Sequence, residues 1–211
     1  MKMKLIEIYK LKSTNERRII NAFVSFCCGL IWAIIQFVIF LITKSFFLFS
    51  SSLFSLSLSL ARLLSIIGYK KEENDKDKSY LVLSSIFIIT GGIFYSSYSL
   101  RLLFGETPTD FGLIPSITIA LFSFIFIINS ITTLIKDRKN KNKYIKNIKI
   151  ISFITSLVNI MLTQMSLLMV QSPNMDQKYN LYFALIIGAI AIILGIYSLI
   201  SGLINKVKNN I

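Results

Sequence analysis

Two polar stripes run along apolar segments of this 211-residue chain, and they hold the residues best suited to binding chemistry. One stripe lies in residues 46–68 and the other in 150–171, and their members recur every three or four positions, which places them on one face of an α-helix. Hydroxyl, amide and guanidinium groups in such a setting form hydrogen bonds with polar atoms. The members are Ser52, Ser55, Ser59 and Arg62 in the first stripe and Ser152, Ser156, Asn159, Thr163 and Ser166 in the second.

Each stripe has two interpretations. Ser and Thr hydroxyls often return a hydrogen bond to a carbonyl of the preceding helical turn, so the stripes could simply hold neighbouring helices together. Alternatively, the stripes face each other and form a polar seam near the centre of a bundle. The candidate residues of that seam are Ser55, Ser59, Arg62, Asn159 and Thr163.

Arg62 is the one charge well inside an apolar segment, six residues before that segment ends at Gly68. Six residues of helix span about 9 Å at about 1.5 Å per residue, and a long arginine side chain can cover most of that distance. Arg62 is therefore either an anchor that reaches the membrane surface or a group that meets an anion or a carbonyl inside the bundle.

Missing residue types narrow the function classes. There is no His, the two cysteines (Cys27 and Cys28) are adjacent, and all ten Asp and Glu residues lie in loops or tails. A proton-coupled carrier uses a buried carboxylate or His, and a carrier of divalent metals needs carboxylate, imidazole or thiolate ligands. The chain also lacks a Ser-His pair and a phosphate-binding glycine loop. We therefore expect no enzyme, no metal site and no cofactor.

Membrane-spanning helices must hold the stripes. Hydrophobic residues make up 54% of the chain and charged residues 16%, with apolar runs longer than a soluble core helix needs. We expect a tight turn at Lys44 and an all-α bundle of six transmembrane helices over 19–204, between a basic segment, 1–18, and a tail, 205–211. The predicted spans are 19–43, 46–68, 80–104, 111–135, 150–171 and 180–204.

The excess of basic residues follows the topology. Against 10 acidic residues there are 23 Lys and Arg: six precede the first span, four follow the second, seven follow the fourth and two follow the sixth. These nineteen share one side, so the positive-inside rule places both termini in the cytoplasm. We expect the lipid bilayer as a partner and no nucleic acid, because no basic segment is interleaved with aromatics. The bias toward Ile, Lys, Asn and Ser suggests a bacterial inner membrane.

Small residues form a further periodic pattern. Six helices with both termini on one side can divide into two halves of three, the second half inverted relative to the first. Small residues recur at intervals of three and four in 180–204, and a second stripe runs through 80–104. Such positions let helix backbones approach closely in lipid. We expect Gly92, Gly188, Gly195 and Gly202 to pack helices within the chain, with a homodimer interface as the alternative.

Residues 48–68, LFSSSLFSLSLSLARLLSIIG, followed by a charged loop and a third span, resemble the transmembrane domain of the cation diffusion facilitators. The likeness covers the layout of most of residues 30–204. It implies six spans and cytoplasmic termini. The family's metal ligands lie on the second and fifth helices, where this chain has Phe54 and Leu58, and Asn159 and Thr163. The resemblance therefore implies the bundle and its orientation without the metal ligands.

Two function classes remain open. The first is a transporter-like protein for a small, uncharged or weakly charged solute, which predicts a water-accessible cavity lined by Ser55, Ser59, Asn159 and Thr163. The second is a non-transporting accessory, immunity or scaffold subunit that binds another membrane protein. It predicts a sealed, dry core and an interaction surface on the small-residue helices or the basic loops.

Overall fold

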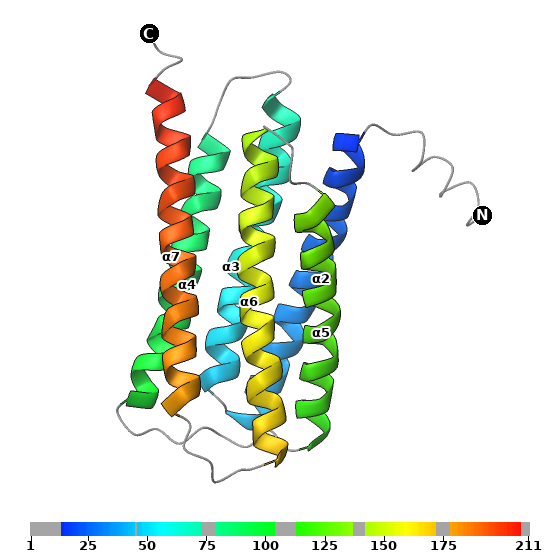
Figure 1. Ribbon diagram of the computed structural model, residues 1–211, viewed down its shortest axis with the longest axis vertical. Coiled ribbons are helices and arrows are strands. Elements are labelled where there is room, and N and C mark those ends of the chain that lie inside the picture. Colours follow the sequence, from blue (N-terminus) through cyan, green and yellow to red (C-terminus); the bar gives the residue numbers. More distant parts are fainter. Residues whose placement is uncertain are drawn as a thin grey trace, which may run out of the picture.

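In the computed structural model, the structure describes residues 14–44, 46–72, 79–103, 113–136, 142–171 and 178–207, and these residues form an all-helical bundle (Figure 1). No strand occurs in these ranges. The helices are α2 (Thr14–Thr43), α3 (Phe46–Glu72), α4 (Ser79–Leu103), α5 (Leu113–Lys136), α6 (Lys143–Gln171) and α7 (Lys178–Val207). The predicted all-helical fold is confirmed, and each predicted span corresponds to one of these helices.

The helices have the length and the surface of membrane spans. Within the described part of the chain, stretches of α2, α3, α4, α6 and α7 are long and apolar enough to cross a membrane. Helix α5 has 24 residues, and its side chains Ile114, Leu121 and Ile125 are exposed. Large exposed apolar side chains are unfavourable in water but are the normal outer surface of a bundle in lipid. These features fit a multi-pass membrane protein.

Helix α6 begins at Lys143, where the sequence predicted a basic connector that runs to Lys149. The side-chain oxygen of Asn142 accepts hydrogen bonds from the backbone N–H groups of Tyr144 at 2.9 Å and Ile145 at 3.2 Å, so Asn142 caps the helix. Hydropathy identified the apolar part of α6. The lysines on its first two turns lower the hydropathy there, so the sequence did not predict that the helix begins before residue 150.

A tight turn joins α2 to α3 at Lys44, as the sequence predicted. Lys44 has a φ of 56°, in the left-handed region, and its N–H donates a hydrogen bond to the carbonyl of Phe40 at 2.7 Å. This pairing is the simple left-handed termination of a helix, and it reverses the chain without a glycine.

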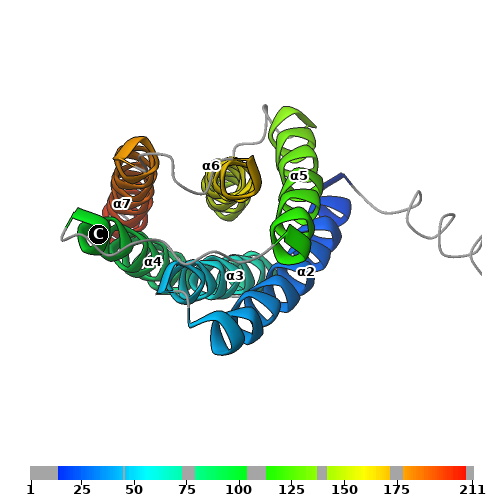
Figure 2. The same ribbon diagram turned by 90° about the horizontal axis from the view of Figure 1, so that it is seen from below.

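Successive helices run in opposite directions, so α2 begins and α7 ends at the same end of the bundle (Figure 1). Viewed along its axis, the bundle is a ring in the order α7, α4, α3, α2, α5 and α6 (Figure 2). Helix α6 contacts α5 and α7 and also packs across the ring on α3. The main apolar core lies there, around Phe54, Tyr95 and Ile154.

The predicted packing glycines lie between α4 and α7 of the same chain. A Cβ added at Gly92 would be 3.2 Å from the carbonyl oxygen of Gly188, and one added at Gly188 would be 3.3 Å from that of Gly92. Further along α7, a Cβ at Gly195 would be 3.2 Å from the backbone nitrogen of Ile89, and one at Gly202 would contact α4 as well. These glycines thus let the backbones of the two helices meet.

Candidate polar binding site

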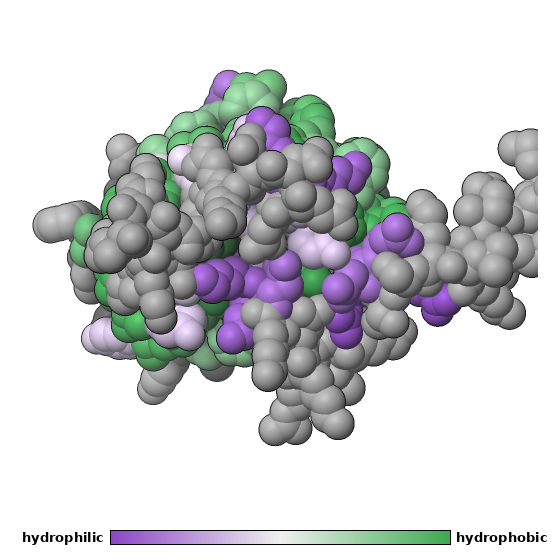
Figure 3. Space-filling view, turned by 90° about the horizontal axis from the view of Figure 1, so that it is seen from above, coloured by the Kyte–Doolittle hydropathy of each residue, from purple (hydrophilic) through white to green (hydrophobic). Residues whose placement is uncertain are grey.

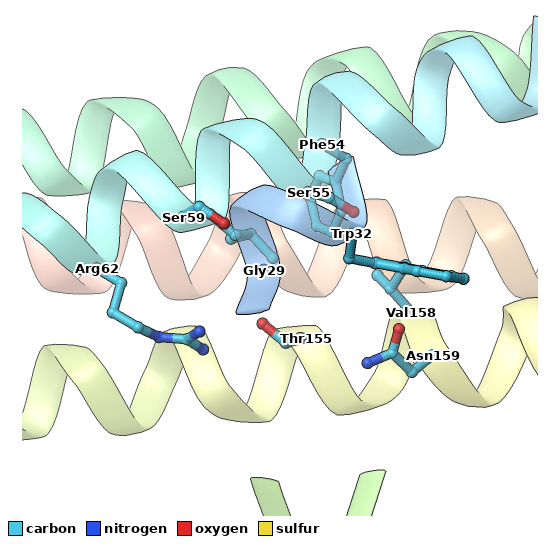
Figure 4. A pocket seen from close by; sticks show the side chains of 10 residues that line it. Gly29, Trp32, Phe54, Ser55, Ser59, Arg62, Thr155, Val158 and Asn159 are labelled. Atoms are coloured by element: carbon cyan, nitrogen blue, oxygen red, sulfur yellow. The ribbon is translucent and has the colours of Figure 1, made fainter. Parts of the chain in front are cut away.

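A cavity lies between α2, α3 and α6, near the middle of each helix (Figure 4). Its empty volume is about 370 Å³ with the space at its mouth, and only a small part of that is wide enough for a water-sized molecule. A bilayer around the bundle would place this cavity near the midplane. The lining residues are Gly29 and Trp32 of α2, Phe54, Ser55, Leu58, Ser59 and Arg62 of α3, and Thr155, Val158 and Asn159 of α6.

The guanidinium group of Arg62 lies inside the bundle. The residue is 5% exposed, and its Nη1 donates a hydrogen bond to the carbonyl of Ser25 on α2 at 3.1 Å. Its Nε is buried and has no hydrogen-bond partner within the described ranges. No acidic side chain among the described residues pairs with it. A buried cation without a counter-ion is costly in a protein interior and marks a functional position in a membrane bundle.

Asn159 faces the same cavity from α6. It is 3% exposed, and its amide nitrogen Nδ2 has no partner among the residues that the structure describes. In Figure 4, Thr155 lies between the side chains of Arg62 and Asn159. An unpaired buried donor costs about 1–3 kcal/mol, so two of them in one cavity call for a bound partner.

Gln36 of α2 bonds to α3 beside the cavity. Its side-chain amide lies 3.2 Å from the hydroxyl of Ser51 and 3.1 Å from that of Ser55. In the orientation with the amide oxygen and nitrogen of Gln36 exchanged, the oxygen accepts a hydrogen bond from the indole Nε1 of Trp32 at 3.0 Å. The Trp32 ring packs against Phe122 of α5 in a tilted arrangement, with 5.4 Å between centroids and 35° between the ring planes. Ser55 and Trp32 are therefore held in place at the edge of the cavity.

Gly29 permits the close approach of α3 to α2 at this point. A Cβ at Gly29 would be 2.6 Å from the hydroxyl oxygen of Ser59 and 4.0 Å from Nη1 of Arg62. Because position 29 has no side chain, Ser59 can lie close to α2 and Arg62 can reach the carbonyl of Ser25. The only sequence signal for this role is a glycine within a long apolar run.

The structure brings together four residues of the predicted seam: Ser55, Ser59, Arg62 and Asn159. Thr163 does not line the cavity, contrary to the prediction. Its hydroxyl donates a hydrogen bond to the carbonyl of Asn159 at 2.9 Å, within its own helix. Thr155, one turn before Asn159, lines the cavity instead, and the sequence analysis did not include it.

A second buried polar cluster, centred on Asn147, was also missed. The amide nitrogen of Asn147 donates to the hydroxyls of Ser65 at 2.9 Å and Ser84 at 2.8 Å, and its oxygen accepts from Ser198 at 2.7 Å. Ser198 in turn accepts from Ser85 at 2.9 Å. These bonds join α3, α4, α6 and α7. Because the amide of Asn147 has partners on both of its polar atoms, the cluster holds the helices together and offers no free donor.

Hydrophilic side chains gather at the end of the bundle where α2 begins (Figure 3). The basic residues of the described helices on this end include Arg17, Arg18, Lys70, Lys71 and Lys146. At the opposite end, the basic residues in the described ranges are Lys44, Arg101 and Lys178. This asymmetry is the one that the sequence predicted from its loops.

The fold and the site together define a helical membrane bundle with a polar cavity at its centre. No protein-family model matches the chain, and no curated protein matches it either. Among the described residues, no group of three His, Cys, Asp or Glu side chains could hold a metal ion. Phe54 and Leu58, which the resemblance to the cation diffusion facilitators aligned with metal ligands, are apolar walls of the cavity.

Proposed function

We propose that this chain is a transporter-like, non-enzymatic membrane protein that binds a small polar solute in the cavity between α2, α3 and α6. One observation carries the proposal: Arg62 and Asn159 are both buried, line the same cavity and keep a nitrogen donor without a partner among the described residues. A bundle that serves only as a scaffold gains no stability from unpaired donors, whereas a polar solute would accept hydrogen bonds from both.

The pairing of helices supports an inverted repeat of α2–α4 and α5–α7. Each helix of the first half meets its counterpart: α4 packs extensively on α7, α3 packs on α6, and α2 meets α5 through Trp32 and Phe122. A pseudo-two-fold axis that relates two such halves would pass between α3 and α6. Transporters built from inverted repeats bind their solutes near the midplane at this interface.

The distribution of charge supports an orientation with both termini in the cytoplasm of a bacterial inner membrane. The end of the bundle with Arg17, Arg18, Lys70, Lys71 and Lys146 would then face the cytoplasm. The cavity would lie between this end and the opposite face, on a route for a solute across the bilayer.

An accessory or scaffold role would be favoured by a dry core and by a free small-residue face. The cavity argues against the first feature, and Gly92 and Gly188 are covered within the chain. The geometry therefore favours the transporter-like role.

Accessibility of introduced cysteines tests the proposal. In a chain with Cys27 and Cys28 replaced by Ser, we expect Ser55→Cys and Asn159→Cys to react with a small hydrophilic thiol reagent in membranes, because water enters their cavity. Ile160→Cys is the matched control, since Ile160 adjoins Asn159 in sequence but is exposed on the outer surface of α6. If both cavity cysteines react no faster than this control, the core is dry and the proposal fails.

A further inference from the structure

We infer that the solute of this cavity is a small monovalent anion, held by the guanidinium of Arg62 and the amide of Asn159. This inference rests on the proposed function and specifies its substrate class. It follows from the charge, the hydrogen-bonding groups and the size of the cavity.

The cavity carries a positive charge without a neutralising partner. Among the described residues that line it, Arg62 is the only charged one, and none of the ten carboxylates of the chain lies within a predicted span. The one hydrogen bond recorded for the guanidinium goes to the neutral carbonyl of Ser25. A cation in this cavity would be repelled, and a neutral solute would leave the buried charge uncompensated, whereas an anion would neutralise it.

The free hydrogen-bonding groups are mainly donors. Nε of Arg62 and Nδ2 of Asn159 are buried without partners in the described structure, and the hydroxyl of Ser59 lines the same space. The hydroxyl hydrogen of Thr155 is already donated to the carbonyl of Ile151 at 2.8 Å. These donors come from the facing helices α3 and α6, and the guanidinium of Arg62 would give an anion a charge-assisted hydrogen bond.

The size and walls of the cavity restrict the anion to a small one. Only a small part of the empty volume accepts a water-sized molecule, which suits a halide or a planar oxyanion such as formate or nitrate. Phe54, Leu58 and Val158 form apolar walls that lower the local dielectric constant and so strengthen the attraction between Arg62 and an anion. A single cationic group matches a single negative charge.

Trp32 provides a direct probe, since it is the only tryptophan of the chain and it lines the cavity. Iodide quenches tryptophan fluorescence on close approach, so we expect iodide at constant ionic strength to quench purified protein with a saturable component. Chloride and nitrate should compete with this component. Quenching that rises linearly with iodide, or is unaffected by chloride and nitrate, would overturn the inference.

Three variants test the roles of the named residues. Arg62→Gln should weaken the saturable component at least about tenfold, the loss of a charge-assisted contact, and Arg62→Lys should retain part of it. Asn159→Asp keeps the side-chain size and puts a negative charge in the cavity, so it should abolish saturable quenching in a folded protein. The control is Lys146→Gln, which removes an exposed positive charge outside the cavity and should change nothing.

These outcomes separate the inference from the proposed function. If Asn159→Cys reacts with the thiol reagent but iodide quenching stays linear in the original protein, the cavity is hydrated and takes a neutral solute, and only the inference fails. If neither signal is seen, both fail. Saturable quenching that Arg62→Gln and Asn159→Asp leave unchanged would place the iodide elsewhere and would also overturn the inference.

Discussion

At the scale of single residues, buried polar groups in this protein fall into two kinds. Asn147 has partners on three other helices for both of its amide atoms, and it therefore stabilises the bundle. Arg62 and Asn159 have buried nitrogen atoms without partners in the described structure, and they face a cavity. The structural cluster and the proposed binding site are both polar. They differ in whether their buried polar atoms have hydrogen-bond partners.

Replacement of Asn147 tests the structural role. Asn147→Ala removes three interhelical hydrogen bonds, each worth about 0.6 kcal/mol in a membrane bundle, so the free energy of unfolding should fall by about 2 kcal/mol. Thermal unfolding in detergent measures this loss. Lys146→Ala, at the exposed neighbouring position, should leave the unfolding temperature unchanged, and an equal effect of the two substitutions would contradict the role of the cluster.

The sequence predicted Ser55, Ser59, Arg62 and Asn159 at the candidate site because a repeat of three or four residues identifies a helical face. It could not show the rotation of that face at each turn, so Thr163 was included and Thr155 was not. Asn147 lay outside the predicted spans, between 111–135 and 150–171, because lysines lower the hydropathy of the turns around it. The approach of Ser59 to Gly29 depends on the distance between two helices, which no periodic pattern contains.

At the scale of elements, close backbone packing of α4 on α7 joins the ends of the two halves. At Gly92, Gly188 and Gly195 there is no room for a further side chain between these helices. The opposite face of α7 carries exposed residues, Ala189 and Ile193 among them. Since apolar burial does not drive helix association in lipid, contact between backbones is the main source of stability here.

A pair of leucine substitutions on α7 tests this interface. Gly195→Leu would force a side chain against Ile88 and Ile89 of α4 and should destabilise the protein by about 1–3 kcal/mol, as overpacking usually does. Ala189→Leu adds a similar side chain on the exposed face and should change stability by less than about 0.5 kcal/mol. Thermal unfolding in detergent compares the two. Equal stability of both variants would mean that α7 does not depend on its glycines.

At the scale of the whole molecule, the helices of the described residues form a ring, in which α4 packs on α7 and α6 packs across the ring on α3 (Figure 2). Hydropathy predicts the number of helices and the apolar part of each, because span length follows from bilayer thickness, but it does not predict the polar turns that extend α2, α3 and α6. It does not predict which helices become neighbours. That choice depends on matching surfaces such as the α4 and α7 glycines, whose partners lie far apart in the sequence.

Reporter fusions test the orientation of the whole chain. Alkaline phosphatase, which is active only outside the cytoplasm, should be inactive when fused after residue 207 and active when inserted within 104–112, as the positive-inside rule requires. The phosphatase activity, normalised to the amount of fusion protein, is the measurement. The reverse pattern would mean that the basic end of the bundle lies outside the cytoplasm.

The central claim is that the middle of this bundle holds a hydrated polar site. The most direct test is the ratio of thiol-labelling rates of Asn159→Cys and Ile160→Cys in sealed membranes with a hydrophilic reagent. We predict a ratio well above one, because residue 159 faces the cavity while residue 160 lies on the exposed apolar face of α6. A ratio of one or less would contradict the account.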